Sequence, residues 1–104
     1  MKTIKERVSG DVMIEEDTQI QGIVSGKVYV GPGANLLHQG MILGALTLDR
    51  DSEVNLFGFV KGDVVNKGGV LNVFGTVNGT VRTEGGKTKI AKDAFIKQEM
   101  NLSV

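Results

Sequence analysis

A phrase of seven residues, repeated four times, decides the fold of this chain. The copies are Gly22-Ile-Val-Ser-Gly26-Lys-Val28, Gly40-Met-Ile-Leu-Gly44-Ala-Leu46, Gly58-Phe-Val-Lys-Gly62-Asp-Val64 and Gly75-Thr-Val-Asn-Gly79-Thr-Val81. Their leading glycines are separated by 18, 18 and 17 residues. Such a step is too short for a pair of helices or a leucine-rich repeat, but it accommodates one three-sided coil of β-strand.

Between the glycines, aliphatic residues alternate with other residues. They occupy even positions at Val24, Val28, Val30, Leu36, Ile42, Leu46, Leu48, Val54, Leu56 and Val60. A period of two is typical of strands with one buried face, so these side chains are predicted to point inward. Polar or glycine-rich breaks at 15–19, 31–35, 49–53, 66–69 and 84–87 are predicted corners. The sequence therefore predicts an all-β protein, a single-domain parallel β-helix.

The length of 104 residues fits one domain, spanning residues 1–104. We expect coils at roughly 6–21, 22–39, 40–57, 58–74 and 75–92, and a terminal cap, strand or short helix at 93–104. The 12 basic and 12 acidic residues balance, which disfavours a nucleic-acid partner. The chain has no cysteine, and its start carries charges where a signal peptide needs an apolar run. We therefore expect a cytoplasmic protein.

Several stretches resemble the polymer-forming domain of the bactofilin family of bacterial cytoskeletal proteins. They are Val28-Tyr-Val-Gly-Pro-Gly-Ala-Asn35, the phrases that begin at Gly40 and Gly58, and Leu71-Asn-Val-Phe-Gly75-Thr-Val-Asn-Gly79-Thr-Val81. The resemblance covers roughly residues 8–96. It implies a right-handed three-sided β-helix that assembles end to end into nonpolar filaments without nucleotide, often near the membrane. The tails through which family members contact membranes and partners have almost no counterpart here, so membrane association stays open.

The spacing alone also fits left-handed β-helix acyltransferases, which place an aliphatic residue at every sixth position. Val24, Val30, Leu36, Ile42, Leu48, Val54 and Val60 follow that rule. The right-handed preference of parallel connections and the glycine pattern favour the right-handed form.

Few residues suggest chemistry. His38 is the only histidine, and its even position predicts a packed side chain in the column of Leu56 and Val73, with a catalytic base as the alternative. Acidic residues at 15–17 and at 49–53 are predicted to be solvated corners, with calcium as the alternative. A local excess of lysine at 87–97 is predicted to be solvated, with anionic lipid or an acidic partner as the alternative. We expect no catalytic residue, no metal and no cofactor, and hence not an enzyme.

An apolar stripe on the outward face is the more informative anomaly. Ile23, Met41 and Phe59 are 18 residues apart, with Leu43 and Phe57 beside them. Exposed apolar strips mark contact sites. Alternatively, the C-terminal segment covers the stripe with Phe95, Met100, Leu102 and Val104.

The ends of a β-helix expose unpaired strand edges, which can bind another copy. Phe95 is therefore also a candidate contact at the C-terminal end. We expect a structural scaffold that self-associates through its ends or the stripe. The alternative is a capped binding module, either a dimer or an adaptor or inhibitor of one protein partner.

Overall fold

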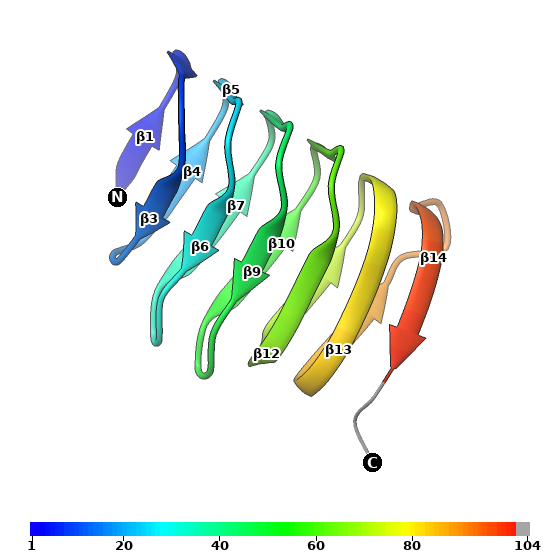
Figure 1. The fold of residues 1–104 in the computed structure, drawn as a ribbon. Helices are drawn as coiled ribbons and strands as arrows, with labels where there is room; N and C mark the ends of the chain where they lie inside the picture. The colour runs from blue at the N-terminus through cyan, green and yellow to red at the C-terminus, as the bar shows by residue number, and fades with distance from the viewer. Residues whose placement is uncertain (102–104) are drawn as a thin grey trace.

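A computed structural model describes residues 1–101 of the chain, with side chains to residue 99. These residues form fourteen β-strands in one continuous parallel sheet and contain no helix. Successive coils lie about 18 residues apart, so the chain is a β-solenoid of about five turns (Figure 1). The predicted all-β parallel β-helix is confirmed.

Three walls make up each coil. The first wall contains β1 (Lys2–Ile4), β4 (Thr18–Ile20), β7 (Asn35–His38) and β10 (Glu53–Leu56). The second contains β2 (Arg7–Val8), β5 (Ile23–Val24), β8 (Met41–Ile42) and β11 (Phe59–Val60), and the third contains β3 (Val12–Ile14), β6 (Val28–Val30) and β9 (Leu46–Leu48). The last three strands, β12 (Val64–Val73), β13 (Thr76–Ile90) and β14 (Phe95–Asn101), bend around corners and contribute to more than one wall.

The winding of the chain is right-handed. In Figure 1 the chain ascends the rear wall through β4, crosses the top through β5 and descends in front through β6 while it advances toward the C-terminus. Every strand pairs in parallel with the strand one coil before or after it, as in the register of Ile23 with Met41 and of Met41 with Phe59. The three-sided, right-handed expectation therefore holds.

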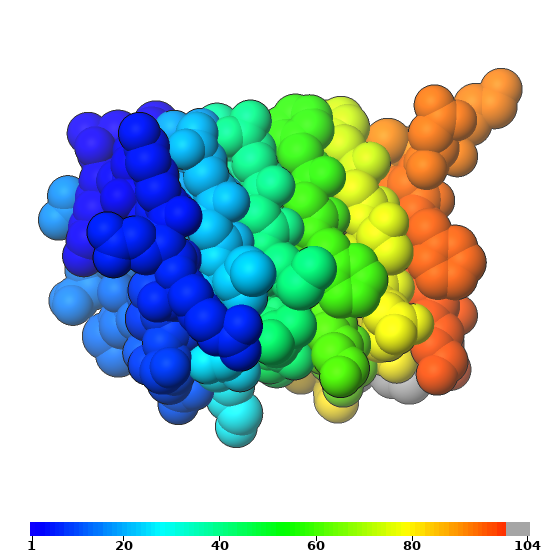
Figure 2. Space-filling model, turned by 90° about the horizontal axis from the view of Figure 1, so that it is seen from above, coloured from blue at the N-terminus to red at the C-terminus, as the bar shows by residue number. Residues whose placement is uncertain are grey.

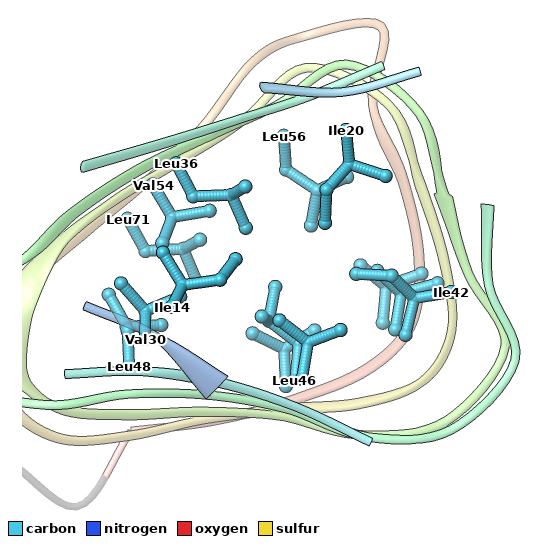
Figure 3. Packing of buried hydrophobic residues seen from close by; sticks show 14 of the residues in the cluster. Ile14, Ile20, Val30, Leu36, Ile42, Leu46, Leu48, Val54, Leu56 and Leu71 are labelled. Atoms are coloured by element: carbon cyan, nitrogen blue, oxygen red, sulfur yellow. The ribbon is translucent and has the colours of Figure 1, made fainter. Parts of the chain in front are cut away.

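The predicted inward residues form the core. Val24, Ile42, Leu46, Leu48, Val54, Leu56 and Val60 are all fully buried. Figure 3 shows buried side chains in stacked columns, with the column of Leu36 and Val54 and the column of Ile20 and Leu56 on one wall and those of Leu46 and Leu48 on the wall opposite. The stacking follows from the pairing, because residues in register on neighbouring coils point the same way.

The inward residues change from even to odd numbers in the fourth and fifth coils. Asn66 is buried, but the next inward residue is Leu71, which pairs with Val54. The pairing of β12 with β13 has register shifts between Asn66 and Val70, where the predicted corner at 66–69 lies within β12. One residue fewer in this coil, the 17-residue step of the sequence, accounts for the change.

Asn66 secures this shortened corner. Its Oδ1 accepts hydrogen bonds from the backbone N–H of Gly68 at 3.1 Å and of Gly69 at 2.9 Å. Its Nδ2 donates to the carbonyl of Lys87 at 2.9 Å. A buried amide with its donor and acceptor both engaged replaces the hydrogen bonds that the bend removes from the ladder.

The described coils differ at both ends from the expected boundaries. Residues Lys2–Ile4 form β1 and pair with Thr18–Ile20, so the first coil includes residues ahead of the expected start at residue 6. At the other end, β14 pairs in parallel with β13 and continues the solenoid. Of the alternatives for 93–104, the described part is therefore a strand.

Candidate functional site: the apolar stripe and the solenoid ends

The outward side chains of the second wall form one column across the coils. The register runs from Arg7 through Ile23, Met41, Phe59 and Thr76 to Phe95. Met41 and Phe95 are exposed, whereas Ile23 and Phe59 are half-buried. Leu43 is half-buried at the corner that follows Ile42. Figure 2 looks down on this side of the molecule, where successive coils lie against one another in a continuous surface.

The remaining phenylalanine, Phe74, which the sequence pattern did not reveal, extends the stripe. The rings of Phe57 and Phe74 stack with centroids 4.6 Å apart and planes 9° from parallel. Both side chains are about half exposed, at 53% and 45%. Phe57 follows β10, and Phe74 lies at the equivalent corner of the next coil. Each residue immediately precedes the leading glycine of a repeated phrase, Gly58 or Gly75. The 17-residue spacing of these Phe-Gly pairs is the signal that could have identified Phe74.

The described part of the C-terminal segment does not cover the stripe. Phe95 pairs in register with Thr76 and is 57% exposed, so it continues the column. Leu102 and Val104 lie outside the described residues, as does the side chain of Met100. The apolar surface formed by Met41, Phe57 and Phe74 is thus open to solvent in the described structure.

At the N-terminal end, the first coil offers an apolar surface. Among the described residues, β1, β2 and β3 each pair with one strand only, β4, β5 and β6 respectively. Ile4, Val8 and Val12 continue the inward columns and are half-buried, packed against the core on one side. A shallow hollow at this end is lined by the same three residues and by Lys2, Lys5 and Glu6.

At the C-terminal end the inward columns finish differently. The column of Val8, Val24, Ile42, Val60 and Val77 ends in Ile96. The column of Val12, Val28, Leu46, Val64 and Val81, however, ends in Glu99. Glu99 is exposed because no described strand follows it in the column. The two ends are therefore chemically different.

His38 lies in the core, as its position predicted. It is fully buried and stacks between Ile20 and Leu56 in the register of the first wall. Its Nε2 donates to the carbonyl of Phe59 at 3.0 Å, while Nδ1 has no partner among the described residues. Burial lowers the pKa of His38, partly offset by the hydrogen bond to Phe59. The lowered pKa favours the neutral form of the ring, and the side chain has no surface in contact with solvent.

In the acidic corner at 49–53, the carboxylate of Asp49 makes local hydrogen bonds. Asp49 accepts from the hydroxyl of Tyr29 through Oδ2 and from the backbone N–H of Arg50 at 2.7 Å through Oδ1. The hydrogen bond from Tyr29 lowers the pKa of Asp49 and raises that of Tyr29. Asp51 adopts a left-handed backbone with φ of 59°, which closes the turn. Within residues 1–101, no three acidic or histidine side chains come together as metal ligands.

Two further observations concern the chain as a whole. No helix in the described part of the chain is long and apolar enough to cross a membrane. Comparisons with protein-family models, with characterised proteins and with solved structures gave no significant match to this chain. The stripe and the two ends of the solenoid are therefore the features that bear on function.

Proposed function

We propose that this protein is a structural scaffold that works by binding copies of itself through the ends of its solenoid. The observation that carries the proposal is the first coil, whose three strands each have a free edge among the described residues and whose inward side chains Ile4, Val8 and Val12 are only half-buried. Within residues 1–101 no further strand covers these three apolar side chains.

A second copy would supply the missing layer. Each free strand edge presents backbone N–H and C=O groups at the spacing of a β-ladder, and pairing would satisfy them. Burial of apolar surface would add about 25 cal/mol for each Å² removed from water. Both contributions are available to the folded chain alone, so assembly needs neither nucleotide nor metal. The resemblance to bactofilins supports the same conclusion and suggests filaments in a bacterial cytoplasm.

Sedimentation and negative-stain electron microscopy of the purified chain, without nucleotide or added metal, test the proposal. The proposal expects a concentration-dependent increase in mass above the 11.1 kDa of one chain. Filaments would extend the scaffold role to polymer formation. A species that stays monomeric at the highest concentrations would overturn it.

A second candidate function, a binding module for another protein, is favoured by the exposed stack of Phe57 and Phe74. Two aromatic rings held face to face on a rigid corner offer a preorganised apolar contact. The substitution Phe59→Arg tests which surface carries self-association, because it places a charge in the stripe and leaves both ends unchanged. Unaltered self-association would assign assembly to the ends and leave the stripe free for another protein, whereas its loss would assign assembly to the stripe.

A further inference from the structure

Within residues 1–101, the first wall ends one layer before the other two walls at the C-terminal end. Its last stretch, Lys87–Ile90 of β13, pairs with Val70–Val73 of β12, and no described strand pairs with its other side. In Figure 1 the rear wall ends with this orange stretch, whereas the front wall ends with β14. We infer that this first-wall edge binds an extended segment of another protein in which acidic and aliphatic residues alternate. The inference goes beyond the proposed function and is independent of it, because one chain carries the whole edge.

The backbone of the edge is placed to continue a regular series of hydrogen bonds. Ile90 follows Ile20, His38, Leu56 and Val73 in one register column. The carbonyl group of each of these four residues accepts a hydrogen bond of 2.8 Å from a backbone N–H group of the next coil. The carbonyl group of Ile90 occupies the next position in the series, and no N–H group of the described residues reaches it. An added strand would supply that donor, as in other cases of binding by strand addition.

The inward side chains of the edge lack the apolar cover that they have elsewhere. The four residues before Ile90 in its column are fully buried, whereas Ile90 is 36% exposed. Thr88, the other inward residue, is half-buried and follows the fully buried Leu71 in register. A strand bonded to this edge would place alternate side chains over Thr88 and Ile90. Aliphatic side chains at those two positions would extend the core by one layer.

The outward side chains of the edge are two exposed lysines, Lys87 and Lys89. No carboxylate among the described side chains forms an ion pair with either ammonium group. Outward side chains of neighbouring coils meet on this wall, because Nδ2 of Asn72 donates to Oδ1 of Asn55 at 3.0 Å, and Lys89 follows Asn72 in register. An added strand would therefore place its outward side chains beside the two lysines. Carboxylates are favoured there, and further ammonium groups would be repelled.

The two faces of the edge together specify the sequence of the bound segment. In the register of the preceding coils, acidic residues lie opposite Lys87 and Lys89, and aliphatic residues lie opposite Thr88 and Ile90. The bound segment therefore reads acidic, aliphatic, acidic, aliphatic. No four consecutive residues of the chain meet this pattern in full, although Glu53–Leu56 comes close with asparagine in the third position. The pattern thus points to another protein as the partner.

A peptide with the predicted pattern tests the inference. The probe is fluorescein-labelled Gly-Glu-Val-Glu-Ile-Gly, and its binding to the purified full chain is followed by fluorescence anisotropy at low salt. Gly-Glu-Glu-Val-Ile-Gly is the control, because it has the same composition and charge without the alternation. We expect the alternating peptide to bind about tenfold more tightly than the control and to lose affinity as salt is added. Equal affinities for the two peptides would overturn the inference.

A reversal of charge tests the role of the two lysines. The double variant Lys87→Glu/Lys89→Glu should bind the alternating acidic peptide about tenfold more weakly and should bind Gly-Lys-Val-Lys-Ile-Gly in its place. Lys61→Glu/Lys97→Glu is the matched control, because it changes the net charge equally at two exposed lysines away from the edge. It should bind the acidic peptide as the wild type does, and circular dichroism checks that both variants are folded. An equal loss of binding in the two double variants would contradict the assignment of the site.

Amide chemical shifts locate the bound peptide. We expect the peptide to shift the NMR signals of Lys87–Ile90 and to leave those of β1, which is the N-terminal edge of the same wall, unchanged. Shifts confined to β1 would overturn the inference. A monomeric wild type that binds the peptide would overturn self-association alone. A wild type that self-associates and binds no peptide would leave the scaffold function standing and overturn the peptide site.

Discussion

The substitution Gly40→Ala tests why the repeated phrase begins with glycine. A Cβ at position 40 would lie 2.8 Å from the carbonyl carbon of Gln21 and closer still to the carbonyl oxygen of Gly22. Both atoms belong to the backbone of the preceding coil, so no side-chain rotation can relieve the overlap. That oxygen also accepts the hydrogen bond from the backbone N–H of Met41 at 2.9 Å. An added methyl group must therefore force the two coils apart.

The magnitude follows from these contacts. Overpacking of this kind costs about 1–3 kcal/mol, and loss of the Met41 hydrogen bond at this corner adds about 1–3 kcal/mol. A total of about 2–6 kcal/mol is a large part of the roughly 5–15 kcal/mol by which a domain is stable. For a chain of this size each kcal/mol lowers Tm by about 4–8 °C, so we expect Gly40→Ala to lower Tm by about 10 °C or more.

Gly31→Ala is the matched control for this measurement. Its added Cβ would lie 3.4 Å from the carbonyl oxygen of Ile14, an ordinary contact, and Gly31 has no positive φ. By restricting the unfolded chain, the alanine should leave stability unchanged or raise it by up to about 1 kcal/mol. Thermal and urea unfolding followed by circular dichroism give both values. Equal stabilities for Gly40→Ala and Gly31→Ala would refute the argument that close coil contact selects the leading glycines.

Three further predictions concern buried and exposed side chains. The free energy of unfolding should fall as the pH decreases below about 6.5, because the histidine is protonated in the unfolded chain while burial lowers the pKa of His38 in the folded one. His38→Leu should remove up to about 1.4 kcal/mol of this loss per pH unit. Unfolding at pH 7.5 and 5 measures this, and identical pH dependence in both proteins would contradict it. Asn66→Ala should cost about 2–4 kcal/mol in urea unfolding, because it leaves the N–H groups of Gly68 and Gly69 without their acceptor; a loss below about 0.5 kcal/mol would show that water replaces the amide. A double-mutant cycle with Phe57→Ala and Phe74→Ala should give a coupling of about 0.5–1.5 kcal/mol in thermal unfolding, and additive effects would mean that the rings do not stack in solution.

The walls of the solenoid could be predicted from the sequence because one physical rule governs them. Residues such as Ile42, Leu46 and Val60 alternate with outward residues, and a single period of two places all of them inside. His38 followed the same rule despite its polarity, because its place in the column was fixed by Ile20 and Leu56 on the neighbouring coils.

The remaining features depend on contacts between coils, which a local pattern does not contain. The corner at Asn66 appeared as a polar break, but its side chain is buried because it bonds with the backbone of its own corner and of the next coil. Phe74 was missed as a partner of Phe57 because the shortened coil changed its number from odd to even. Glu99 was missed because its inward position depends on the register of β14 with β13, after two irregularities in the pairing.

The arrangement of coils also makes the length of this molecule adjustable. Every pair of strands in close contact is a pair of hydrogen-bonded neighbours on adjacent coils, such as β5 with β8 or β6 with β9. No contact of this kind connects the first coil with the fourth, so a whole coil can be duplicated or deleted without rebuilding the others. A duplicated stretch of one 18-residue coil would lengthen the solenoid by about 4.8 Å, the distance between neighbouring strands. The number of repeated phrases in the sequence therefore sets the length of the solenoid in steps of one coil.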